Sequence, residues 1–152
     1  MLEALANRIG SIDINSIVSL VIDEKRYFIL DLIRSQLIEG ERGDGTPIGI
    51  YSDSDISRRY VDLKFDMGLF QGNSYPNYDL FFEGTFYKSL VLTIQGDHIQ
   101  IDSLDPKLGD IESNIFDKDI SKSLELNAEN LQILINEMEP LIQQKINAKF
   151  GI

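Results

Sequence analysis

The sequence predicts an α+β fold in which a small antiparallel sheet packs against long N- and C-terminal helices. Apolar residues recur at helical spacing near both ends of the chain, and β-favouring residues flank a turn over 91–103. At 152 residues the chain is long enough for one domain with an ordinary core. We therefore expect a single domain, 1–152, built from a helical segment, Gly-rich loops, a hairpin region, an acidic loop and a terminal helix. These segments are expected at 1–40, 41–78, 79–103, 104–125 and 126–152.

The first long helix is expected to run from Asp13 or Asn15 to Gly40. Either side chain at its start can accept from free backbone N–H groups, and glycine at its end adopts positive φ at little cost. Such a helix is long beside the mean of about 11–12 residues. We therefore expect part of its apolar surface to face another subunit. The stretch 2–9 is expected to form a separate short helix.

The region 41–78 is expected to lack regular structure, because it opens with closely spaced glycines. Arg58, Arg59 and Lys64 form the basic concentration in the middle of the chain. One interpretation is surface salt bridges to neighbouring acids, which contribute little stability. The other is a contact patch for the acidic face of a neighbouring copy.

The loop over 68–78 is unusually apolar and aromatic. Loops of this composition insert into interfaces or fold back over the core. Leu69, Phe70 and Tyr75 are therefore further candidates for contacts between subunits.

The β-hairpin is expected at Val91–Ile94 and Ile99–Ser103, joined by the Gly96-Asp97 turn. Because side chains alternate along a strand, four apolar residues should share the core-facing side. They are Leu92, Ile94, Ile99 and Ile101.

The stretch after the hairpin is acidic and is expected to be a solvated connection. Its carboxylates, Asp110 and Asp117 among them, lack the close spacing of a cation-binding loop. They are candidates for contacts with the basic cluster of another copy. Its apolar residues should attach the stretch to the body. They are Ile111, Ile115, Phe116 and Ile120.

The terminal helix is expected to begin after Asn127, whose side chain can cap it, with Leu126 and Leu131 as a hydrophobic staple. Pro140 removes one internal hydrogen bond and should kink or restart the helix. A single apolar stripe should follow one face. It contains Leu131, Leu134, Ile135, Met138, Leu141, Ile142, Ile146 and Phe150.

Composition disfavours several function classes. A net charge of −11 opposes direct nucleic-acid binding, which depends on neutralising phosphates. The chain has no Cys, and its one histidine, His98, has no second histidine or nucleophilic serine nearby in the sequence. We expect no catalytic, cofactor-binding or metal-binding residues, and so no enzyme. The apolar runs are too short for a membrane span, and no export signal is visible.

Three stretches occur in a characteristic order: Gly40–Ile50, then Glu-Gly-Thr-Phe-Tyr-Lys-Ser-Leu at 83–90, then Ile115-Phe116 with Leu-Glu-Leu-Asn-Ala-Glu-Asn at 124–130. This order resembles phage virion-morphogenesis proteins of the tail-completion, or head–tail connector, type. The resemblance implies a structural virion subunit, assembled in the host cytoplasm. Its partners would be copies of itself in a ring and other connector or tail proteins.

A second hypothesis comes from the charge. An acidic binding protein, such as a DNA mimic or a host-enzyme inhibitor, would carry carboxylates along one face to occupy a basic cleft. Both hypotheses remain open at the level of the sequence.

Overall fold

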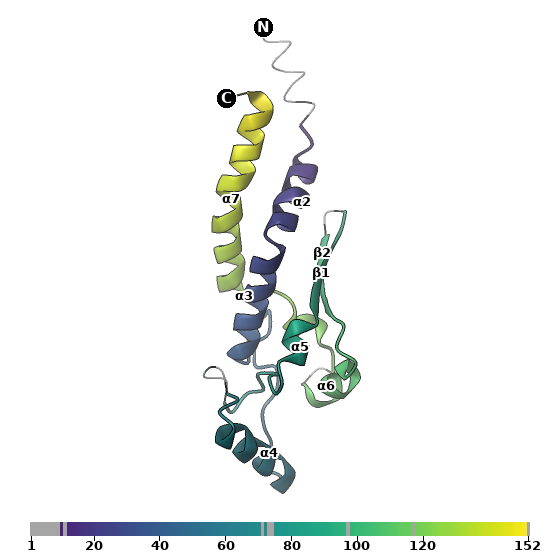
Figure 1. Cartoon of the computed structure of the whole chain (residues 1–152), viewed down its shortest axis with the longest axis vertical. Coiled ribbons are helices and arrows are strands. Elements are labelled where there is room, and N and C mark those ends of the chain that lie inside the picture. Colours follow the sequence, from purple (N-terminus) through teal and green to yellow (C-terminus); the bar gives the residue numbers. More distant parts are fainter. Residues whose placement is uncertain are drawn as a thin grey trace.

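The computed structural model describes residues 10, 12–70, 72, 75–96, 98–116 and 118–151, and these form an α+β fold (Figure 1). The expected short helix at 2–9 lies outside the described residues. The helices are α2 (Ile14–Glu24), α3 (Arg26–Ile38), α4 (Asp55–Asp66), α5 (Thr85–Lys88), α6 (Leu108–Asn114), the 3-10 helix η1 (Ser121–Ser123) and α7 (Ala128–Phe150). The strands are β1 (Leu90–Gln95) and β2 (His98–Ser103).

The elements are arranged around a rod made of α2 and α3 (Figure 1). Helix α7 runs back along one side of this rod, and the β-hairpin lies on the other side. Helices α4 and α6 lie at the end away from the start of α2 and the end of α7. The molecule is therefore elongated, with its smaller helices gathered at one end.

The expected single N-terminal helix is two helices, separated at Lys25. The chain turns there without a glycine or proline, and the Lys25 N–H still donates to the carbonyls of Val21 and Ile22. The two axes consequently follow one another in line (Figure 1). The expected ends are confirmed, because Asp13 caps α2 by accepting from Ser16 N at 3.1 Å and Gly40 has φ of 75°.

The core forms where α2, α3 and α7 meet the base of the hairpin. Val21 and Ile33 are fully buried, and Leu134 and Met138 of α7 pack against them. The apolar stripe predicted along α7 is only partly in this core, because Leu131 and Ile135 are 46% and 47% exposed. Helix α7 also continues through Pro140 without a restart.

Buried polar contacts connect α3 to the start of α7. The Gln36 amide donates to the carbonyl of Glu125 at 2.8 Å and accepts from Asn127 N at 2.8 Å. The Asn130 amide donates to the carbonyl of Leu32 at 3.1 Å. Asn127 itself caps α7 by accepting from Asn130 N, as predicted. These bonds satisfy main-chain groups that helix packing would otherwise leave unpaired.

The hairpin has the predicted strands and pairing, with Leu92 opposite Ile101 and Ile94 opposite Ile99. Its base is buried, whereas Ile99 near the turn is 40% exposed. Arg26 of α3 donates to the main-chain carbonyl of Leu92 at 2.6 Å and so covers part of the outer edge of β1.

Both expected loop regions and the hairpin region contain helices. Within 41–78, Ser54 caps α4 by accepting from Ser57 N at 3.2 Å. The hairpin region 79–103 begins with α5, and the acidic stretch 104–125 contains α6 and η1. Ile111, Ile115 and Ile120 attach this stretch to the core, but Phe116 is 57% exposed. None of the described helices has the length and apolarity to cross a membrane.

Truncating Leu134 to alanine should lower the free energy of unfolding by about 2–5 kcal/mol, since the side chain is buried between α7 and the rod. Leu131→Ala, on the exposed side of the same helix, is the matched control and should cost far less. Chemical denaturation of both variants checks this. Equal losses would mean that α7 presents a different face to the core.

Candidate functional site

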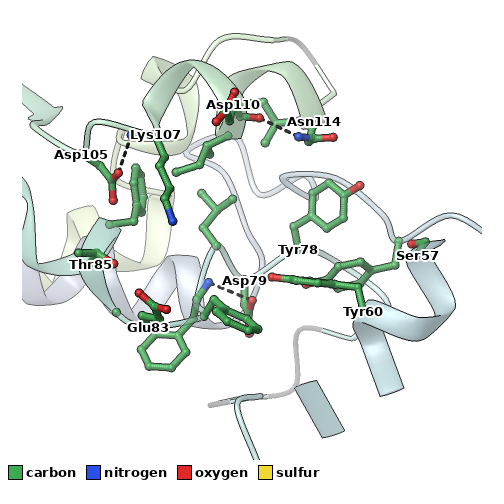
Figure 2. A pocket seen from close by; sticks show the side chains of 18 of the residues that line it. Ser57, Tyr60, Tyr78, Asp79, Glu83, Thr85, Asp105, Lys107, Asp110 and Asn114 are labelled. Carbon is green, nitrogen blue, oxygen red and sulfur yellow. Dashed lines mark hydrogen bonds between the residues drawn. The ribbon is translucent and has the colours of Figure 1, made fainter. Parts of the chain in front are cut away.

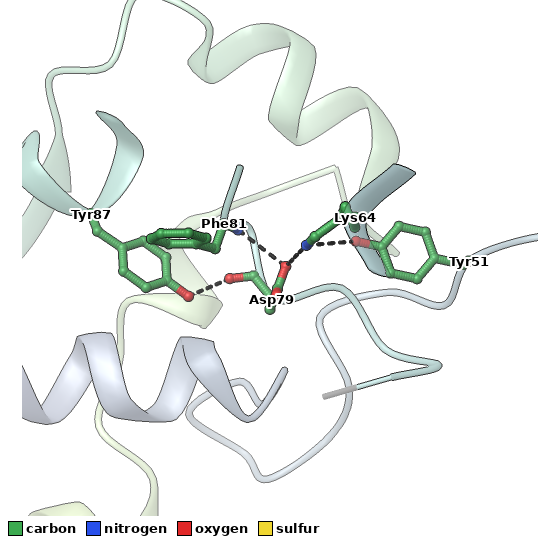
Figure 3. A network of polar contacts seen from close by, with 5 residues as sticks. All are labelled: Tyr51, Lys64, Asp79, Phe81 and Tyr87. Atoms are coloured by element: carbon green, nitrogen blue, oxygen red, sulfur yellow. Dashed lines mark hydrogen bonds and ion pairs between the residues drawn. The ribbon is translucent and has the colours of Figure 1, made fainter. Parts of the chain in front are cut away.

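The best-defined polar site is a buried ion pair between Lys64 of α4 and Asp79 (Figure 3). Both side chains are completely buried. The ammonium of Lys64 also contacts the hydroxyl of Tyr51 at 3.3 Å and lies 4.4 Å from the centre of the Phe70 ring. The charge is thus held by one carboxylate, one hydroxyl and an aromatic face.

The main chain around Asp79 is fixed by further bonds. Its carboxylate accepts from Phe81 N at 3.1 Å, and its carbonyl accepts from the hydroxyl of Tyr87. Leu80 between them has φ of 54°, a left-handed conformation that costs an L-residue about 1–2 kcal/mol. The second carboxylate oxygen, Oδ2, is buried without a hydrogen-bond partner among the described residues. The surrounding contacts therefore hold a strained turn in place.

Burial dominates the electrostatics of this site. It lowers the pKa of Lys64, and the hydrogen bond and charge of Asp79 oppose that shift. It raises the pKa of Tyr51 and of Tyr87, and the negative charge of Asp79 raises both further. The two phenols consequently stay protonated in the folded protein at pH values where a free tyrosine ionises.

A pocket of about 600 Å³ lies beside the ion pair (Figure 2). Helix α4 contributes Ile56 and Tyr60 to one wall, and α6 contributes Asp110 and Asn114 to another. The segment 78–86 runs along the pocket between them. The pocket therefore exists because the ion pair holds α4 against this segment.

The lining of the pocket combines aromatic walls with a mostly acidic rim. Tyr60 and Phe82 stack with ring centres 5.7 Å apart, while Glu83 and Lys107 are exposed charges of opposite sign. Aromatic faces beside carboxylates suit an apolar group or a cation. Among the described residues no group of three or more His, Asp or Glu side chains is placed to hold a metal ion.

The basic residues predicted as a contact patch divide into two environments. Arg58 and Arg59 are exposed on α4, as a surface patch requires. The prediction is wrong for Lys64, which is fully buried because it faces the aromatic interior and pairs with Asp79.

The other predicted contact residues lie near the same end of the molecule. Leu69 and Phe70 are half-buried, and Phe70 packs against Tyr75, which is 52% exposed. Asp110 is exposed on α6, across the pocket from α4. Asp117 lies outside the described residues.

Sequence reasoning did not identify Asp79, Tyr51 or Tyr87 as parts of a site. The available signal was local: Asp79 is a single acid within the aromatic run 78–82. A carboxylate in such surroundings needs a buried partner, and Lys64 lies three positions after the buried Val61. The pairing itself joins segments that are distant in the chain.

Comparison with known proteins identifies no relative. No protein-family model, no curated protein and no solved structure matches the chain. The function is therefore argued from the residues and their geometry.

Replacing Lys64 with alanine should lower the free energy of unfolding by about 3–5 kcal/mol, because it leaves the Asp79 carboxylate buried without its cation. Lys145→Ala, which breaks a more exposed pair with Glu24, should cost about 1 kcal/mol or less. The double variant Lys64→Met with Asp79→Asn should recover most of the loss. Denaturant titration distinguishes these results, and a Lys64→Ala variant as stable as Lys145→Ala would mean that Lys64 and Asp79 do not form a buried pair.

The buried tyrosines also predict a pH dependence. Their pKa values are raised on folding, so above about pH 10 the unfolded chain binds fewer protons than the folded one. The contribution of these tyrosines to the free energy of unfolding should therefore fall as pH rises from about 9 to 11. Tyr87→Phe should make this fall shallower, whereas Tyr27→Phe at an exposed position should leave it unchanged. If the free energy of unfolding fell equally steeply with pH in both variants, Tyr87 would not be a source of the pH dependence.

Proposed function

We propose that the chain is a structural subunit of a phage head–tail connector or tail, related in role to tail-completion proteins. It acts by assembling with copies of itself and with other virion proteins, without catalysis. The observation that carries the proposal is the amount of large apolar surface left exposed on separate helices. Leu20 of α2, Ile56 of α4 and Ile135 of α7 are 57%, 83% and 47% exposed.

The positions of α7 and of the hairpin suit a ring. Helix α7, on which Leu131 and Ile135 are exposed one turn apart, lies on one side of the α2–α3 rod (Figure 1). The hairpin lies on the other side (Figure 1). A ring needs two different surfaces that face away from one another, because each copy contacts its two neighbours differently.

The hairpin offers a second kind of contact. Among the described residues, no main-chain group outside the hairpin bonds to the outer edge of β2 over 99–103. A two-stranded sheet is marginally stable alone, and an open edge can accept an additional strand from a neighbour. The acidic charge of −11 favours contacts with basic partner proteins over direct contact with packaged DNA.

The expected contact between the basic cluster of one copy and the acidic stretch of the next would require the two charged surfaces to lie on opposite sides of the molecule. Helix α4, which carries Arg58 and Arg59, and helix α6, which carries Asp110, line the same pocket. Their charges lie at one end of the molecule rather than on opposite sides. We therefore assign the ring contacts to the α7 face and the hairpin edge.

Deleting the gene from its phage should leave filled heads and tails that do not join, as seen by electron microscopy of lysates. Complementation with the wild-type chain should restore joined particles, and mass spectrometry should detect the chain in them. The variant Leu131→Ser with Ile135→Ser should fold but fail to complement, because both side chains are exposed in the subunit.

Gln132→Ser with Asn136→Ser is the matched control, since these residues are exposed on the same turns of α7 and bond mainly to one another. It should complement normally. If purified particles lack the chain, the structural role is wrong, and the acidic inhibitor becomes the better hypothesis.

A further inference from the structure

Helix α4 presents a partly exposed apolar stripe beside its buried face, and two residues of the stripe, Ile56 and Tyr60, also line the rim of the pocket. The buried face carries Val61 and Lys64. The stripe follows the spacing of four, three and four residues that is typical of paired helices. Its members are Ile56, Tyr60, Leu63 and Met67, with exposed fractions of 83%, 39%, 45% and 55%.

Apart from Asp55 in the first turn, the exposed charges on α4 are placed against the preference of an isolated helix. The exposed cations Arg58 and Arg59 lie in its first half, and the exposed anions Asp62 and Asp66 lie in its second half. A helix dipole favours the opposite order. The single cation of the last turn, Lys64, is buried against Asp79 and leaves these anions uncompensated at the surface. This order of cations before anions becomes favourable when a helix with the same order lies alongside in the opposite direction, because cations of one helix then lie beside anions of the other.

We propose that α4 pairs in antiparallel orientation with α4 of a second copy of the chain, about a two-fold axis. The stripe is self-complementary in this arrangement. Ile56 meets Met67 of the other copy, and Tyr60 meets Leu63, each contact occurring twice. An antiparallel pair aligns residues whose numbers have a constant sum, and both contacts satisfy the same sum.

The charges select the same orientation. Arg59 and Asp66 lie seven residues apart along one border of the stripe, so an antiparallel partner places each beside the other's opposite charge. In a parallel pair this border would face the opposite border of the partner, so Arg59 and Asp66 would not meet. The Lys64–Asp79 pair borders the stripe, because Lys64 follows Tyr60 by one turn, and it fixes the position of the helix that presents the stripe.

This pairing is independent of the proposed ring. A two-fold contact closes at two copies and cannot extend around a ring. It uses α4, whereas the ring contacts are assigned to α7 and the hairpin. A helix pair of three turns is a small interface, so we expect a weak dimer with a dissociation constant in the micromolar range or higher.

Sedimentation of the full chain over a concentration series tests the proposal. The wild type should dimerise, and Arg59→Asp or Asp66→Arg alone should weaken the dimer several-fold by placing like charges together. Combining the two substitutions should restore it. Arg58→Asp is the control, because Arg58 lies about 100° further from the stripe around α4 than Arg59 does. Leu63→Ser should raise the dissociation constant about tenfold or more, whereas Leu20→Ser on α2 should not.

Cysteine cross-linking gives a direct test of direction, since the chain has no Cys. Arg59→Cys with Asp66→Cys should form a disulfide-linked dimer on mild oxidation, and Arg59→Cys alone should not. A wild-type chain that stays monomeric up to about 1 mM, a dimer that the charge reversals leave unchanged, or cross-linking by Arg59→Cys alone would each overturn the proposal. Absence of the chain from phage particles would overturn the virion role and leave this pairing intact.

Discussion

The contact on which one end of the molecule depends is the buried pair of Lys64 and Asp79. It holds α4 against the turn that leads into α5 and the hairpin. The pocket follows in part from this contact, because one wall comes from α4 and the segment 78–86 runs along it. The exposed stripe of α4 follows as well, since fixing Lys64 inside determines which residues remain outside. A single pair thus determines both candidate interaction features at this end.

A buried ion pair determines geometry better than it adds stability. Removing two charges from water costs several kcal/mol per ion, and their attraction only roughly offsets that cost. Here the aromatic rings of Tyr51 and Phe70 surround the ammonium, and one carboxylate oxygen of Asp79 remains unpaired. An apolar pair would pack as well but would tolerate several positions of α4. We infer that the charged pair is the element that specifies one position.

The sequence predicts those parts of the fold whose signals are local. Asn127 and Asp13 cap helices that carry long apolar patterns, and the hairpin follows from alternation around Gly96. The sequence does not predict helix α4, because its apolar residues form two faces and so do not show one clear helical spacing. Its N-cap, Ser54, is also a weak signal among neighbouring serines and aspartates. The burial of Lys64 was missed for a different reason. Its partner is fifteen positions away and on another element, so no local pattern reveals it.

The two faces of α4 give a physical reason to regard it as an interaction element. A helix that served only the fold would bury its apolar stripe and expose its lysine, since that arrangement removes the most apolar surface from water. In α4 the lysine is inside, and Ile56, Leu63 and Met67 are outside. The free subunit thus leaves apolar area in contact with water that a partner can cover. Because Arg59 precedes Asp66 along the border of this surface, the partner that suits it is an apolar helix running in the opposite direction with the same order of charges, which a second α4 supplies.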